Sequence, residues 1–191
     1  MPDQSITPAK KSAIIEAALE LIAVHGFHGT PTSRIAQEAG AGVGSIYRYF
    51  KSKDELIHEL FDHVAKRMSL EVMKDFENDA SIREQFIQIG TNVFAYLIGH
   101  PKVAAFIEQY FNSPYGISHK RDAILNVHPL NDVLDKAREQ GLVKDLTFHI
   151  LGVLSIGPIV LLVRDIHAGL MDMDDATIKR VIEACWDAII R

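Results

Sequence analysis

Hydroxyl, guanidinium and ammonium groups are concentrated between residues 32 and 53, and their chemistry suits the binding of an anion. Hydroxyl and backbone N–H groups bind phosphate oxygens, arginine binds phosphate or guanine, and lysine supplies positive charge. Gly44 has no side chain, so a phosphate or a base edge can approach the backbone there. The predicted nucleic-acid contacts are Thr32, Ser33, Arg34, Val43, Gly44, Ser45, Tyr47, Arg48, Tyr49 and Lys53.

The elements that must position these groups are predicted to be helices. Apolar residues recur every three or four positions along nearly the whole chain, with no convincing period of two, so the fold class is all-α. The first helix is expected over about 8–25, capped by Thr7. Two short helices are expected over about 32–39 and 43–49, joined by the turn Gly40-Ala41-Gly42.

A longer helix followed by two short ones with a tight turn is typical of a helix-turn-helix DNA reader. Ile46 and Phe50, four residues apart, are predicted to face inward against Ile35, which turns the rest of the second short helix outward. Thr32 combines a hydroxyl with the backbone N–H groups of a helix start, which makes it an anion site by geometry. Lys53 opposes the dipole of the next helix, and a phosphate partner would explain it.

The rest of the chain predicts six further helices. Ser52 and Ser81 are each followed three positions later by glutamate, which forms a capping box. The stretch 113–116 is expected to be a loop, and Asp145 is expected to cap an apolar helix. The expected helices are one from residue 53, then 82–99, 102–112, 119–140 with a kink at Pro129, 146–168 and 174–190.

Two stretches closely resemble the DNA-binding signature of the tetracycline-repressor-like (TetR/AcrR) family: TSRIAQEAG at 32–40 and GSIYRYFKSKDEL at 44–56. The chain departs from it with Ala41-Gly42 where a valine and a polar residue are common, and with Pro31 in place of a first threonine. The second departure leaves Thr32 as the candidate for capping and for phosphate binding. The resemblance implies a homodimer that represses promoters and releases DNA on binding a small molecule. It implies a three-helix DNA-binding domain, 1–52, and a six-helix effector-binding and dimerisation bundle, 53–191.

Two sets of residues in the second part are candidates for effector binding and for dimer contacts. Aromatic and amphipathic groups beside the Gly157-Pro158 break suit a mostly hydrophobic effector, although the same spacing suits core packing. The last two helices are the most apolar segments near the C-terminus, which favours a homodimer interface there. The candidate effector contacts are Phe86, Phe94, Phe106, Tyr110 and His128; the candidate dimer contacts are Ile178, Ile182, Cys185 and Ile189.

Composition narrows the function classes. The 191 residues are 24% charged and 48% hydrophobic, as in ordinary globular proteins. The net charge of −5 is unevenly distributed along the chain. Residues 1–53 hold six basic and four acidic residues, a charge of +2, and the remaining residues carry −7. The largely uncharged stretch 150–163 is shorter than the ~20 residues that cross a bilayer, so it is predicted to be a buried core helix, with no membrane partner.

The alternatives to a ligand-responsive repressor are an enzyme on an all-α bundle, an activator, and a ligand-independent regulator. The nine histidines are scattered, and the pair His58 and His63 diverges around a helix, so no metal site, no cofactor and no catalytic residue is predicted. The single cysteine, Cys185, excludes an intramolecular disulfide and fits a buried apolar role. The expected location is the cytoplasm.

Overall fold

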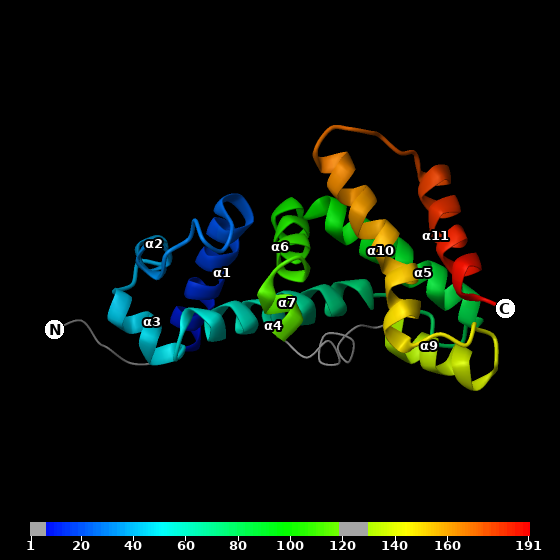
Figure 1. The fold of residues 1–191 in the computed structure, drawn as a ribbon, viewed down its shortest axis with the longest axis horizontal. Helices are drawn as coiled ribbons and strands as arrows, with labels where there is room; N and C mark the ends of the chain where they lie inside the picture. The colour runs from blue at the N-terminus through cyan, green and yellow to red at the C-terminus, as the bar shows by residue number, and fades with distance from the viewer. Residues whose placement is uncertain (1–6, 119–129) are drawn as a thin grey trace. The chain divides into compact units, whose positions relative to one another are not determined.

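The computed structural model describes residues 7–118 and 130–191, and these residues form helices and connections without a β-strand (Figure 1). The all-α prediction is confirmed. Two compact units are present: Met1–Val64 with Ala105–His119, and Ala65–Ala104 with Lys120–Arg191. The described helices are α1 Pro8–His25, α2 Thr32–Glu38, α3 Val43–Tyr49, α4 Lys53–Val72, α5 Ile82–Gly99, α6 Pro101–Phe111, α7 Pro114–Ser118, α9 Leu130–Glu139, α10 Phe148–His167 and α11 Asp175–Ile189.

The first unit is built on α1. Thr7 is its N-cap and Pro8 its first residue, as predicted, but the Thr7 hydroxyl makes no capping bond. Gly26 ends the helix with a φ of 70°, a left-handed conformation that costs glycine little. Packing of α2 on α1 and of α3 on α2 completes the expected helix-turn-helix. Its core is formed by buried apolar side chains: Ile14, Ala18, Ile22, Ile35, Ala36, Ile46, Phe50, Leu56 and Leu60.

The first unit also contains the second half of α6 and the short helix α7. The expectation of a loop at 113–116 is wrong, because Pro114 begins a helix. Proline suits a first helical position, since its missing N–H has no partner to lose there. Gly116 permits the close packing: a Cβ at this position would lie 2.5 Å from the Tyr110 carbonyl oxygen.

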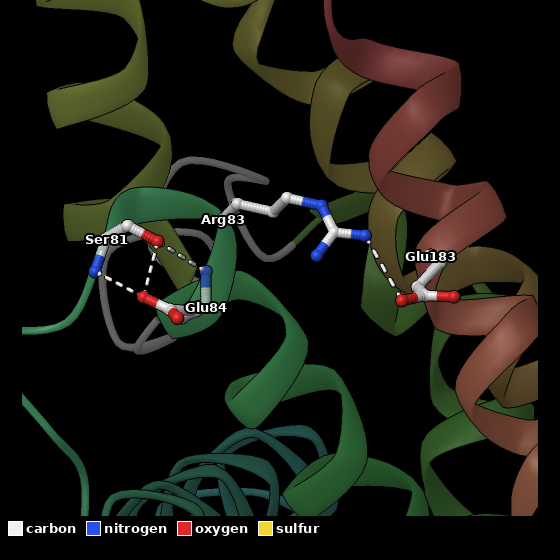
Figure 2. Close-up of polar contacts among 4 residues, drawn as sticks. All are labelled: Ser81, Arg83, Glu84 and Glu183. Carbon is white, nitrogen blue, oxygen red and sulfur yellow. Dashed lines mark hydrogen bonds and ion pairs between the residues drawn. The ribbon is translucent and has the colours of Figure 1, made fainter.

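The second unit packs α5, α10 and α11 against one another, with α9 on α5 (Figure 1). Figure 2 shows how α5 begins: the Ser81 hydroxyl accepts the Glu84 N–H, and the Glu84 carboxylate accepts the Ser81 N–H. This capping box was predicted and is confirmed. Arg83, in the same turn, donates to the Glu183 carboxylate of α11 across 3.1 Å.

The apolar helix α10 begins later and is less buried than predicted. Thr147 is its cap, accepting the Ile150 N–H at 3.4 Å, so the expected cap at Asp145 is wrong. The backbone just before Asp145 is already hydrogen-bonded elsewhere, because Lys144 donates its N–H to the Ile189 carbonyl. The helix has 20 residues and runs through Pro158, so the expectation of a break at Gly157-Pro158 is wrong. By length and composition it is long and apolar enough to cross a membrane.

Only one face of α10 is buried, and it carries Leu151, Ser155, Ile159 and Val163. The prediction of a buried core helix is therefore wrong for the opposite face. Ile150, Val153 and Leu161 are exposed there, at spacings that place them along one stripe. These three residues form the α10 stripe, an apolar surface that the rest of the chain leaves exposed.

Helices α9 and α11 cover the other sides of the bundle. Asp174 caps α11 by accepting the Thr177 N–H at 2.8 Å, as its predicted start requires. Gly141, with a φ of 68°, follows the end of α9. The expected helix over 119–140 is present from Leu130, and its earlier part, with Pro129 and His128, lies outside the described residues.

Candidate DNA-binding interface

The turn between α2 and α3 is fixed by backbone hydrogen bonds and a glycine. Gly40 has a φ of 60°, in the left-handed region, and its N–H donates to the Gln37 carbonyl at 3.1 Å. The Ala41 N–H donates to the Ala36 carbonyl at 2.8 Å, which closes the end of α2. The departure from the family pattern at 41–42 is therefore compatible with a tight turn.

The predicted two faces of α3 are confirmed. Ile46 and Phe50 are buried, at 0% and 1% exposure, against the core of the first unit. The opposite face presents Tyr47, 51% exposed, beside an exposed Arg48. The other predicted contacts follow this division: Val43 and Gly44 are exposed, Ser45 and Tyr49 are half-buried, and Ser33 and Arg34 are exposed on α2.

Two hydroxyl groups meet between α2 and α3. The Thr32 Oγ1 and the Tyr47 hydroxyl lie 3.3 Å apart, although fifteen residues separate them in the sequence. The cap of α2 is Pro31, not Thr32, so the expectation that Thr32 caps this helix is wrong. Its hydroxyl is directed to Tyr47 instead. One of the two hydroxyls donates to the other, so the pair keeps one donor of the kind that binds phosphate oxygens.

Tyr49 has a partner within the chain. Its hydroxyl accepts the Thr7 N–H at 3.0 Å, a bond between the end of α3 and the start of α1. This bond uses one of the orphan donors that every helix start leaves. Tyr49 therefore fixes the recognition helix against α1, and its expected contact with phosphate stays a prediction.

Lys53 begins α4 and donates from its ammonium to the Phe27 carbonyl. Burial lowers the pKa of Lys53, and the neighbouring Asp54 carboxylate opposes this shift. The carbonyl gives this lysine an acceptor at the unfavourable end of a helix dipole without any phosphate. The phosphate contact of Lys53 stays a prediction. The sequence did not indicate that Phe27 would be a partner of this lysine.

The start of α4 departs from a regular capping box. Glu55 donates its N–H to the Ser52 hydroxyl at 3.1 Å, which is the predicted half of the motif. Its carboxylate accepts the N–H of Lys51 in place of the Ser52 N–H. The reciprocal bond thus closes one residue earlier and holds the connection between α3 and α4.

Gly44 has no steric reason to be glycine within this chain. A Cβ at this position would have no other atom within 4 Å, and its φ is not positive. A glycine in a helix interior costs about 1 kcal/mol relative to alanine. The fold alone would therefore favour alanine, and the close approach of a phosphate or base edge to Gly44 stays a prediction.

The candidate effector residues fall in different units. Phe106 and Tyr110 are fully buried in the first unit, where Phe106 lies edge-on to Phe27 and Tyr110 stacks on Phe61 at 4.2 Å. Their rings contribute to the core that holds α4 and α6 together. Phe86 and Phe94 are buried in the second unit, with the Phe86 ring 5.1 Å from that of Trp186.

The candidate dimer residues mostly face the chain's own core. Ile182 and Ile189 are 0% exposed and Cys185 is also buried, whereas Ile178 is half-buried. The Ile182 side chain packs against α5 at Gly90. A Cβ added to Gly90 would lie 2.7 Å from the Cγ2 of Ile182. Burial also raises the pKa of the Cys185 thiol. The side of α11 that the sequence offered for a partner is thus already covered.

Two hydrogen-bonded contacts of α4 were not predicted from the sequence, one to the end of α6 and one to α7. The His58 Nδ1 lies 2.9 Å from the Tyr110 hydroxyl, and the Tyr115 hydroxyl donates to the Asp54 carboxylate at 3.0 Å. These partners are more than fifty residues apart in the sequence, so no local pattern could have paired them. No group of three metal-ligating side chains occurs within residues 7–118 and 130–191.

Comparison with known families agrees with this geometry. Residues 14–60 match the family described as bacterial regulatory proteins of the tetR family, and residues 81–190 match the tetracyclin repressor-like C-terminal domain. The second match covers more than half of the chain. The protein belongs to the TetR family of helix-turn-helix transcriptional regulators, and it is a DNA-binding regulator of transcription.

Individual relatives extend the similarity over most of the chain. An uncharacterised helix-turn-helix transcriptional regulator from Haemophilus influenzae is 29% identical over 178 residues, 92% of this chain and 93% of its own. A crystal structure of a TetR-family regulator from the same species has 27% identity, covers 95% and 97% of the two chains and gives a TM-score of 0.78. The regulator FadR from Bacillus subtilis, solved with stearoyl-CoA, has the same fold, with 24% identity, coverages of 91% and 96% and a TM-score of 0.74.

Proposed function

We propose that the protein is a homodimeric repressor that binds a palindromic operator through α3 and leaves it when a small, mostly hydrophobic effector binds. The exposed polar face of α3 carries this proposal, since Gly44, Tyr47 and Arg48 lie together on a helix whose other face is buried. Arg48 suits a guanine or a phosphate, and the hydroxyls of Thr32 and Tyr47 suit phosphates. Lys53 adds a phosphate contact at the start of α4.

The α10 stripe supports the homodimer. Val153 and Leu161 are 53% and 51% exposed, and an apolar helix face of this kind is ordinarily covered by another protein surface. Gly157 lies between them along the same stripe and lets a partner helix approach closely. A second copy is the economical partner, because two-fold dimers are the commonest assemblies. Covered in this way, α10 has no need of a bilayer, and the protein acts on DNA in the cytoplasm.

The effector site is proposed in the second unit, near Phe86 and Phe94. The fold holds stearoyl-CoA in the Bacillus subtilis regulator, so it can accommodate an apolar chain with a polar head. Pockets for small molecules are usually apolar with a few polar groups. A coupling of about 1–3 kcal/mol would change operator affinity about 5- to 150-fold, and linkage requires operator DNA to weaken effector binding by the same factor. The proposal needs no catalytic step.

Selection of bound duplexes from a random DNA pool tests the proposed function. The expected product is a palindrome whose half-sites are separated by about one helical turn, or a multiple of it. Mapping such sites to genomic promoters and measuring transcription with and without the protein then separates repression from activation. Recovery of no enriched sequence, or of a single asymmetric half-site, would contradict a symmetric operator.

Calorimetry tests the effector, with stearoyl-CoA as the first probe. The protein should bind the probe more weakly when it is saturated with operator, by the factor that the probe costs operator affinity. Equal probe affinity for free and operator-bound protein would contradict release by this class of ligand.

A further inference from the structure

The first turn of α4 is held by the side chain of Tyr115 and the backbone of Phe27, which both lie outside α2 and α3. Tyr115 of α7 donates its hydroxyl to the Asp54 carboxylate at 3.0 Å. Phe27 accepts from the Lys53 ammonium through its carbonyl, and its ring lies 4.9 Å from the ring of Tyr115. Lys53 and Asp54 are therefore each bound to a different part of one cluster.

The Tyr115 side chain is fixed by packing as well as by this bond. Its ring meets His58 edge-on at 5.9 Å, and His58 is itself 2.9 Å from the Tyr110 hydroxyl. The backbone of α7 lies so close to α6 that only glycine fits at position 116. Burial and the Asp54 carboxylate raise the pKa of Tyr115 to about 12, so its hydroxyl keeps its proton at neutral pH.

Asp54 has opposite effects on the helix and on a DNA complex. A carboxylate in the first turn stabilises a helix, because it faces the positive end of the dipole. The same charge, one residue from the lysine proposed to bind phosphate, repels a DNA backbone. The direction in which the carboxylate is held then decides how strongly it opposes binding.

We propose that Tyr115 is a positioning residue for DNA binding, which holds the Asp54 carboxylate against α7 and away from the phosphates that Lys53 binds. This proposal rests on the proposed function, since it requires Lys53 to lie beside the DNA backbone. A unit charge about 7 Å from a phosphate, in a water-like dielectric, changes binding about threefold. Release only moves a charge that is already present, so it should weaken binding by no more than this factor.

The test compares the wild type with Tyr115→Phe, Asp54→Asn and the double variant. Tyr115→Phe keeps the ring and its packing and removes only the hydroxyl. Binding is measured by fluorescence anisotropy with two labelled duplexes, the selected operator and a random sequence. Tyr115→Phe should weaken binding to both duplexes by up to about threefold at low salt. This loss should vanish at about 0.5 M salt, where the Debye length is only about 4 Å.

The Asp54→Asn background separates charge positioning from simple stabilisation. Asparagine carries no charge to direct, so Tyr115→Phe should cost nothing there, and Asp54→Asn alone should bind at least as tightly as the wild type. Tyr96→Phe, which removes a hydroxyl from α5 in the second unit, serves as the matched control and should leave binding unchanged.

Several outcomes would overturn the inference. An equal loss from Tyr115→Phe in both backgrounds, independent of salt and accompanied by a lower melting temperature, would assign Tyr115 to structure alone. Unchanged binding by Tyr115→Phe, with a wild type that binds the operator, would reject the positioning role and leave the proposed function intact. A wild type that binds neither duplex would overturn the proposed function, and this inference with it.

Discussion

The two compact units differ in how their aromatic side chains are arranged and in what they leave exposed. The first unit gathers the rings of Phe61, Phe106 and Tyr110 between α4 and α6, and the Tyr110 hydroxyl lies 2.9 Å from the His58 Nδ1. Outside, it presents the polar face of α3. The core of the second unit is mainly aliphatic, as is that of the first, and its rings include the neighbouring pair Phe86 and Trp186. Outside, this unit leaves the α10 stripe.

This difference assigns separate partners to the two surfaces. A polar face with hydroxyls, a guanidinium group and an exposed glycine matches the hydrogen-bonding groups and charge of DNA. An apolar stripe on a helix matches another apolar protein surface. Damage to one surface should therefore leave both units folded, whereas damage to either core should unfold a whole unit. The predictions below test this separation, beginning with the largest effect.

The largest contrast is expected between two glutamate substitutions in the second unit. Ile182→Glu places an unpaired charge in a fully buried site and should destabilise this unit by more than about 4 kcal/mol. Leu161→Glu changes an exposed residue of the α10 stripe and should give a folded monomer. Circular dichroism with light scattering distinguishes these results. A folded, monomeric Ile182→Glu variant would place the dimer contacts on α11 instead.

Removal of a core ring from the first unit should cost nearly as much. Phe106→Ala should lower the free energy of unfolding by about 3–5 kcal/mol, because the ring is fully buried against Phe27. Operator binding should fall with it, since the same core holds α4. Leu170→Ala, at a residue that is 75% exposed, is the control and should change neither stability nor operator affinity. Chemical denaturation and anisotropy check both variants, and an intact operator complex with Phe106→Ala would return this residue to the effector site.

A surface substitution on α3 should affect recognition without affecting stability. Arg48→Ala should cost about 1–3 kcal/mol of operator binding and relax the base preference at one position in each half-site, if the guanidinium group reads a base. Melting temperature should not change, because Arg48 is exposed. Selection of bound sequences by the variant tests this expectation. Equal losses on all duplexes would reduce Arg48 to a phosphate contact.

The smallest effect is expected at Gly44, and stability and binding should move in opposite directions. Gly44→Ala should stabilise the fold by about 0.5–1 kcal/mol, since the added methyl group meets nothing and alanine favours a helix. The same methyl group should weaken DNA binding by keeping the backbone of α3 farther from the duplex. Thermal melts and anisotropy measure the two effects. Unchanged or tighter binding would show that DNA does not approach the helix at this point.

The units also differed in how well their sequence predicted them. The two short helices and the inward side chains of α3 follow from local features, namely turn glycines and a four-residue apolar spacing. In α11 the same spacing correctly identified an apolar face, but it did not say what covers that face. Ile182 proved to pack on Gly90 of α5 within the chain. The spacing of apolar residues predicts which face of a helix is buried, but it does not predict which surface buries that face.

The remaining differences arise from contacts between distant residues. Asp145 is a good cap by type, but the backbone just before it is engaged with Ile189, so the helix starts at Thr147. The loop expected at 113–116 forms α7 because a glycine lets it pack on α6. The bond from Tyr115 to Asp54 spans 61 residues and has no local signature. Such contacts depend on the assembled core and cannot be derived from a window of sequence.

The buried thiol of Cys185 has a practical consequence for spectroscopy. It is the one cysteine in the sequence, it is 4% exposed, and burial raises its pKa, which lowers the fraction of reactive thiolate. Maleimide dyes should therefore spare it in the folded protein, and new cysteines placed on α3 or on α10 can be labelled without replacing it. The slow labelling of Cys185 itself would then measure how often the second unit opens, in the same sample.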